Sequence, residues 1–208
     1  MIARYMAANP RVTVELESTS RRVDVIGEGI DVAIRVRFPP IEPSELVMRT
    51  LAEDAQRMVA SPKLIEGMNL PLVPVDLGTL PSLDFAPPLS KHVWELHNAD
   101  GASVSVIHKP RLITDDMSQL LDAALEGVGV AKLPSMIADK HIASGRLVDV
   151  VPGWTARSGI VHAVFPTRRG LLPSVRGLID FLAEEYVALS SRQSLPVAGP
   201  DTQYGTPR

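Results

Sequence analysis

Two adjacent carboxylates, Asp115 and Asp116, are by type the residues of this 208-residue chain best suited to moving protons. Carboxyl groups held against a substrate can act as general acid and general base. Both residues, however, stand where a helix is predicted to start, and acidic side chains there are explained by capping free backbone N–H groups and by the helix dipole. We therefore assign them no catalytic role.

The histidines form no recognisable catalytic or metal-binding pattern. None has H-E-x-x-H spacing, and His92 and His97 lie five residues apart, which would make them diverge on a helix. Cysteine is absent, which excludes disulfides and thiolate metal ligands. We interpret all five as surface or core residues and expect neither a metal nor a cofactor: His92, His97, His108, His141 and His162.

Glycine-rich segments that could hold a phosphate are incomplete. A G-x-G-x-x-G loop fails twice, because Val32 follows Gly27-Glu28-Gly29, and Lys132 follows Gly127-Val128-Gly129, where the third glycine should stand. The chain contains no G-x-x-x-x-G-K-[ST] loop and no G-x-S-x-G nucleophile elbow. The sequence therefore predicts that the chain is not an enzyme.

Composition indicates one globular domain or two small lobes. Hydrophobic residues make up 45% of the chain and charged residues 22%, and the net charge of −3 lacks the basic excess of a chain that holds DNA by itself. No apolar run approaches the roughly 20 residues of a membrane helix. Arg4 and Asn9-Pro10 interrupt any signal-peptide core, so we expect a cytoplasmic location without membrane contact.

Hydrophobic periodicity in the first half favours an α/β fold. A helix over Met1 to Ala8 precedes a strand over Val12 to Ser18, a short helix from Ser20 through Glu28 and a strand over Asp31 to Val36. Parallel strands joined by a helix need cover on both faces, which indicates α/β. Further predictions are extended segments within Leu46 to Ser61, a short helix opened by Pro62, a linker-like Val73 to Pro88, and a hairpin of strands Trp94 to His97 and Val104 to Ile107.

The second half shows two strand-to-helix crossings in succession. Thr114 or Asp115 is expected to cap a helix that Gly127 ends, with apolar residues at i, i+3, i+4, i+7 and i+8. The remaining predictions are a strand over Val128 to Leu133, an element from Pro134 to Gly145, extended segments over Leu147 to Val151 and Gly159 to Pro166, a helix from Pro173 fading near Ser190, and a disordered tail over residues 191–208.

Three passages, in this order, resemble the effector-binding domain of LysR-type transcriptional regulators. The first runs from Asn9 to Val36, the second from Arg111 to Pro152, and the third from Val164 to Tyr186. The matching positions are Asp24, Gly29, Asp31, Ala33 and Ile34 in the first passage, and Pro166, Arg168 and Asp180 to Leu182 in the third.

This resemblance implies a two-lobed, type 2 periplasmic-binding-protein-like α/β fold, each lobe a mostly parallel sheet flanked by helices. Residues 1–72 and 159–190 would form lobe I, and residues 73–158 lobe II. A small molecule would bind in the cleft between them, at the carboxyl ends of parallel strands, where helix N-termini favour anions. The expected effector is therefore a small anion such as an organic acid.

Residues at these strand ends are the predicted ligand contacts: Arg35, Arg37, Phe38, Thr114, Asp115, Leu133, Phe165 and Thr167. Four of them have a simpler interpretation as well. Capping alone explains Thr114, Arg35 and Arg37 could be solvated surface arginines on one strand face, and Phe165 could pack in the core.

The resemblance also implies partners. Such domains pair antiparallel, here through Met1 to Ala8, Val12 to Ser18 and Met117 to Glu126, so we expect a homodimer or higher oligomer. DNA would be bound only through an N-terminal winged helix-turn-helix, which we expect this chain to lack together with the first core strand. The alternatives are an interaction protein that only pairs with intact subunits, and a solute-binding protein of the same fold, against which the missing signal peptide argues.

Overall fold

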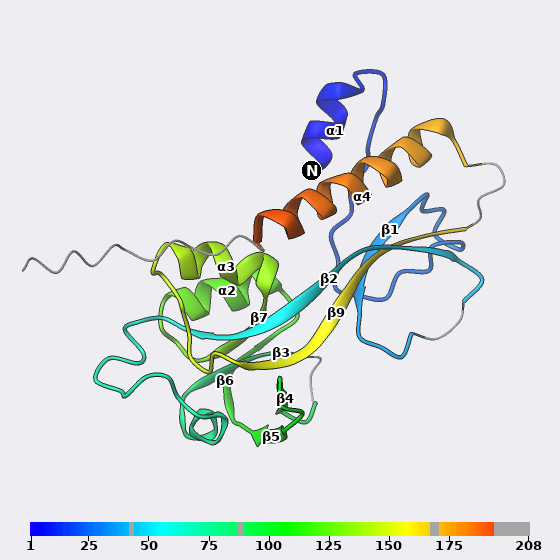
Figure 1. Ribbon diagram of the computed structural model, residues 1–208. Coiled ribbons are helices and arrows are strands. Elements are labelled where there is room, and N and C mark those ends of the chain that lie inside the picture. The colour runs from blue at the N-terminus through cyan, green and yellow to red at the C-terminus, as the bar shows by residue number, and fades with distance from the viewer. Residues whose placement is uncertain (42–43, 87–89, 167–170, 194–208) are drawn as a thin grey trace, which may run out of the picture.

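Two long antiparallel strands cross the whole molecule and connect its two lobes (Figure 1). The structure, a computed structural model, describes all residues except 42–43, 87–89, 167–170 and 194–208. The crossing strands are β2 (Val47–Ala60) and β9 (Trp154–Phe165). Val47 pairs with Phe165 at one end and Gln56 with Ala156 at the other, and the register shifts between Asp54 and Gln56. We call the stretch of β2 from Glu53 to Gln56, with its neighbours, the junction.

Lobe I is built on one side of the junction. The strand β1 (Ala33–Arg37) pairs with β9, and the helices are α1 (Ile2–Ala8) and α4 (Pro173–Gln193). Leu51, Val161, Ala163 and Leu182 form one buried cluster between α4 and the sheet. The two helices are connected by Tyr5, whose hydroxyl donates to the Ser174 carbonyl at 2.7 Å.

Lobe II contains the remaining elements. They are the 3-10 helix η1 (Pro74–Thr79), β3 (Ser82–Phe85), β4 (Val93–Asn98), β5 (Ser103–Ile107), β6 (Pro110–Thr114), α2 (Met117–Leu125), β7 (Ala131–Pro134), α3 (Ser135–Ala143) and β8 (Val148–Asp149). Leu83, Leu120, Leu133 and Ala138 lie in one apolar core, with α2 and α3. Met58, Trp94 and Leu96 lie in a second, with the β4–β5 hairpin.

The predicted α/β fold is confirmed, and its strand directions are more mixed than expected. The pair β3–β6 is parallel, whereas β1–β9, β2–β9, β2–β7 and β4–β5 are antiparallel. Two reasons are that β2 and β9 run in opposite directions through both lobes and that β4 and β5 form a hairpin. The predicted lobe boundaries at residues 72 and 158 stay a prediction. Among the described residues, no helix combines the length and apolarity needed to cross a bilayer.

Two predicted elements of lobe I are wrong. Val12 to Ser18 is not a strand, since no strand of the described residues pairs with it, and Leu16 is 71% exposed. The expected helix from Ser20 to Glu28 is only a turn. Side chains in this segment accept hydrogen bonds from nearby backbone N–H groups, and such bonds compete with a regular helix. Asp24 accepts from Gly27 N at 3.1 Å, and Glu28 accepts from Asp24 N at 2.9 Å.

Lobe II requires further corrections. Pro62 opens a turn and not a helix, and Val73 to Pro88 is not a linker, because it contains η1 and β3. The helix α2 is capped by Asp116, whose carboxylate accepts from Ser118 N, one residue later than predicted. In addition, β9 begins at Trp154, before the predicted Gly159. The helix α4 reaches Gln193, so the predicted disordered tail is wrong for residues 191–193, and its remainder, residues 194–208, lies outside the described residues.

Candidate functional site

Strand ends from both lobes meet at the junction. On the lobe I side, Arg37 at the end of β1 pairs with Ile160, which in turn pairs with Glu53. On the lobe II side, Pro134 at the end of β7 pairs with Gln56. Parallel strands β3 and β6 run in the direction of β7, as the parallel bridge between Ser82 and Val130 shows. The carboxyl ends of β1 and of β3, β6 and β7 therefore point toward the same level of β2.

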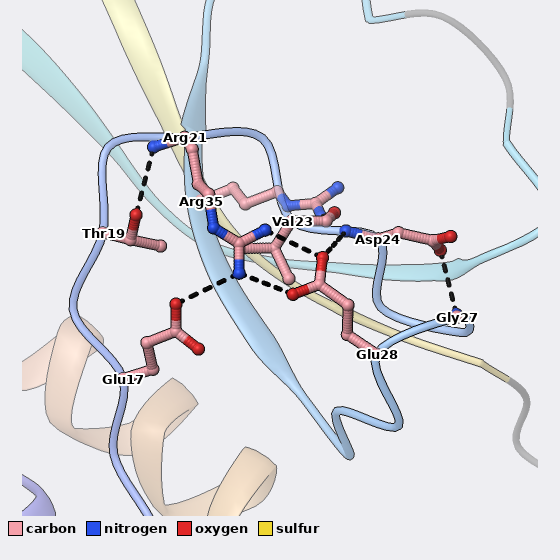
Figure 2. Close-up of polar contacts among 8 residues, drawn as sticks. All are labelled: Glu17, Thr19, Arg21, Val23, Asp24, Gly27, Glu28 and Arg35. Atoms are coloured by element: carbon pink, nitrogen blue, oxygen red, sulfur yellow. Dashed lines mark hydrogen bonds and ion pairs between the residues drawn. The ribbon is translucent and has the colours of Figure 1, made fainter.

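Two arginines on one face of β1 supply positive charge there. The Arg35 guanidinium donates to the Val23 carbonyl at 2.5 Å (Figure 2). Burial lowers the pKa of Arg35, and the charges of Arg37 and Arg22 lower it further. Arg37 is exposed, and among the described residues its side chain makes one long contact of 3.4 Å, with its neighbour's carbonyl. A carboxylate that bound beside Arg37 would therefore relieve repulsion between cations.

An ion-pair network joins residues within the loop before β1. Arg21 bonds to Glu28 at 2.5 Å and to Glu17 at 3.2 Å, as Figure 2 shows. The Arg21 guanidinium and the backbone N–H of Asp24 lower the pKa of Glu28 to about 2. Arg21 is thus already neutralised, whereas Arg37 is exposed at the end of β1 and has no carboxylate partner in the described part of the chain.

Thr114 and Asp115 are the lobe II residues at the contact with the lobe I loop. The Thr114 hydroxyl oxygen accepts from Asp116 N at 3.0 Å, beside the N-terminus of α2. Asp115 accepts a hydrogen bond of 2.6 Å from the Ser20 hydroxyl, which belongs to the lobe I loop. This contact joins residues 95 positions apart and ties the two lobes together.

The other four predicted contacts differ in where they lie. Phe38 follows β1 and is 47% exposed, with its ring near Gly159 of β9. Leu133 is fully buried in the lobe II core. Phe165 is buried with Val175 and Ile179 of α4, at the outer end of β9. Thr167 lies outside the described residues. The structure thus gathers Arg35, Arg37, Phe38, Thr114 and Asp115 toward the junction and leaves the buried leucine and phenylalanine apart; the ligand contacts stay a prediction.

Sequence reasoning missed Asp54, which lies in the junction itself and is only 4% exposed. Its carboxylate accepts from the Ser135 hydroxyl at 2.5 Å and from Met136 N at 3.2 Å, at the start of α3. Burial raises the pKa of Asp54. Burial also raises the pKa of Tyr186 on α4, and the Asp54 charge adds to that shift. The signal was present, since an aspartate in a strand that becomes buried needs polar partners.

A second cluster of polar side chains lies inside lobe II. Asp84 bonds to His92 at 2.6 Å, and Ser82 bonds to His108 at 2.8 Å. The His108 ring stacks on Trp94 with centroids 3.8 Å apart. Burial lowers the pKa of the Lys132 ammonium, and the Asp84 charge partly opposes that shift. No group of three or more metal-ligating side chains occurs in the part of the chain that the structure describes.

His108 should make the stability of the chain sensitive to acid. Burial lowers its pKa to about 4, below the ordinary 6.5, so the folded state excludes a proton that the unfolded chain binds. The contribution of His108 to the free energy of unfolding is fully present above pH 6.5 and is lost as the pH falls toward 4. Between pH 7 and pH 4.5, the free energy of unfolding measured in urea should fall by about 2 kcal/mol more in the parent chain than in His108→Gln.

His97 offers the matched control, because this exposed histidine bonds to Ser103 at 2.7 Å as His108 bonds to Ser82. His97→Gln should keep the acid sensitivity of the parent chain. Equal pH dependence in His108→Gln and the parent would show that His108 is not the source.

Comparison with known proteins places these observations in context. A family model described as the LysR substrate binding domain matches residues 1–187. Among curated relatives, the transcriptional regulator PtxR of Pseudomonas aeruginosa is 29% identical over 88% of this chain and 57% of its own length. The regulator DmlR of Escherichia coli is 29% identical over 86% and 57%. The chain thus spans somewhat more than half the length of these relatives.

Solved structures of regulatory domains have a similar fold. The regulatory domain of AphB in Vibrio vulnificus is 25% identical, with a TM-score of 0.70 and 88% of each chain covered. The regulatory domain of CrgA, a LysR-type transcriptional regulator from Neisseria meningitidis, is 24% identical, with a TM-score of 0.76 and 89% of each chain covered. The second likeness concerns the fold alone.

Proposed function

The chain belongs to the family of LysR substrate-binding domains, and from this premise we propose that it senses a small anionic effector at the junction between its lobes. The observation that supports this best is Arg37, an exposed cation at the end of β1 with no carboxylate partner among the described residues. The N-terminus of α2 reaches the junction from the other lobe, beside Thr114 and Asp115. An arginine without a carboxylate partner favours an anionic ligand, whereas the N-terminus of α2 already carries the Asp116 carboxylate.

Signalling would follow from the contacts that an effector changes. The hydrogen bond from Ser20 to Asp115 and the bonds of Asp54 to the start of α3 connect the lobes. A ligand that binds one arrangement of these contacts better than another shifts the population toward it. In a longer regulator, that shift would alter how paired subunits present their DNA-binding parts in the cytoplasm. The family is one of transcriptional regulators, and we propose no enzymatic activity.

A thermal-shift screen of the chain against small organic acids tests the sensor function. A ligand at 100 times its dissociation constant stabilises the folded state by about 2.7 kcal/mol. For a chain of this size, that corresponds to a rise in the unfolding temperature of roughly 5–10 °C. Arg37→Ala should abolish most of the rise, because it removes the free cation.

Arg11→Ala, an exposed arginine outside the junction, is the matched control and should keep the full response. Circular dichroism and size-exclusion chromatography establish that each variant is folded and report its assembly. A folded chain that no acid stabilises, or an equal response of both arginine variants, would contradict the proposal. The first of these outcomes would favour the alternative of a protein that only pairs with intact subunits.

A further inference from the structure

We propose that lobe I carries a second small-molecule site, beneath the start of α4, that binds an organic carboxylate with an apolar body. The site is a cavity of about 380 Å³, and the residues that line it are Arg49, Phe165, Leu171, Arg176, Ile179 and Asp180. Pockets for small ligands are typically about 300–1,000 Å³, so this one suits a small molecule.

The floor of the cavity is apolar and part of the folded core. Phe165 of β9 and Ile179 of α4 are each 3% exposed, and both belong to one buried cluster against which Leu171 packs. A floor built from core residues is already in place before a ligand binds, which reduces the cost of binding. None of the described lining residues carries a hydroxyl or amide side chain, so a sugar or another polyol would find few partners.

The rim of the cavity carries an uncompensated positive charge. Arg49 forms an ion pair with Asp180, which neutralises both side chains. Arg176 stands on the same helix as Asp180, and its side chain forms no hydrogen bond or ion pair with the described residues. An anionic head group is therefore the part of a ligand that this rim would bind. A guanidinium can hold a carboxylate with two parallel hydrogen bonds.

This cavity is separate from the junction. Phe165 pairs with Val47 at the outer end of the crossing strands, whereas Asp54 lies in the junction. Arg49 precedes Asp54 by five positions on β2, which at about 3.3 Å per residue places them roughly 16 Å apart. A ligand in one place would not touch the arginines of the other, so variants can tell the two sites apart.

Isothermal titration with phenylacetate as the probe tests the site, with phenylacetamide as its uncharged counterpart. The parent chain should bind the acid and bind the amide at least about tenfold more weakly, since a charge-assisted bond contributes about 1.5–3 kcal/mol. Arg176→Ala should weaken binding of the acid by the same factor. Asp180→Asn should strengthen it several-fold, because it frees Arg49 and removes a competing carboxylate.

Arg11→Ala, on the open surface, should bind the acid as the parent does. Equal binding of acid and amide, or unchanged binding in Arg176→Ala, would overturn the proposal, as would no binding to the parent at millimolar concentration. Loss of binding in Arg37→Ala with retention in Arg176→Ala would also overturn it. That last result would place the acid at the junction and leave the proposed sensor function standing.

Discussion

Replacing Asp54 by alanine is expected to lower the free energy of unfolding by about 2–4 kcal/mol. The substitution removes the acceptor for the Ser135 hydroxyl and for Met136 N at the start of α3. A buried polar group left without a partner costs about 1–3 kcal/mol, and two are left here. Relief of the buried negative charge offsets part of this cost. Urea unfolding monitored by circular dichroism gives the difference.

Asp54→Asn is the variant that separates hydrogen bonding from charge. Its amide oxygen can still accept from Ser135 and Met136, so we expect a smaller loss than in the alanine variant. The pKa of Asp54 is raised above 3.8 in the folded state, so its contribution to stability is fully present below that pH and is lost as the pH rises through the folded pKa. Relative to the parent, Asp54→Asn should therefore gain stability as the pH rises.

An alanine variant as stable as the parent would show that Asp54 does not hold α3 against β2. An asparagine variant whose free energy of unfolding differs from that of the parent by the same amount at every pH would show that the aspartate charge carries no cost in the fold. Each result addresses a different part of the explanation, so the two variants together identify which interaction joins the lobes.

Sequence patterns predicted elements that form their structure from local signals. The hairpin around Asn98 to Gly101 and the helix stopped by Gly127 both rest on residues whose backbone preferences are strong, and Gly101 and Gly127 indeed adopt positive φ. The strand β3 was missed because it is only four residues long and is buried between neighbours that come later in the chain. Val12 to Ser18 shows the reverse case, since alternation alone cannot supply a neighbouring strand.

The candidate site shows the same division. Arg35 and Arg37 were predicted because they stand at the end of a strand that reaches the junction. Phe165 was chosen by the same rule, yet β9 runs antiparallel to β1, so its end lies at the far side of lobe I. Strand direction depends on pairing between distant segments, which periodicity does not contain. Asp54 was overlooked because its partners, Ser135 and Met136, come from a helix 81 and 82 residues later.

Gly129 provides the second large effect, and it explains a motif that failed as a phosphate loop. A Cβ built at Gly129 would lie 2.9 Å from the Pro81 carbonyl oxygen and from two Ser82 backbone atoms. These atoms belong to the backbone that joins β3 to the bridge at Val130, where Leu83 N donates to the Val130 carbonyl at 2.8 Å. The glycine is therefore required for close approach of two backbones and not for binding a ligand.

Gly129→Ala is expected to destabilise the chain by about 1–3 kcal/mol or more, because backbone cannot move aside as a flexible side chain can. Gly177→Ala is the matched control: its Cβ would lie 3.1 Å from the Tyr5 hydroxyl, the far end of a side chain, and alanine favours the helix α4 by about 1 kcal/mol. Urea unfolding should rank Gly129→Ala well below Gly177→Ala. Equal stability of the two variants would mean that β3 can shift away from residue 129, and the packing explanation of this glycine would fail.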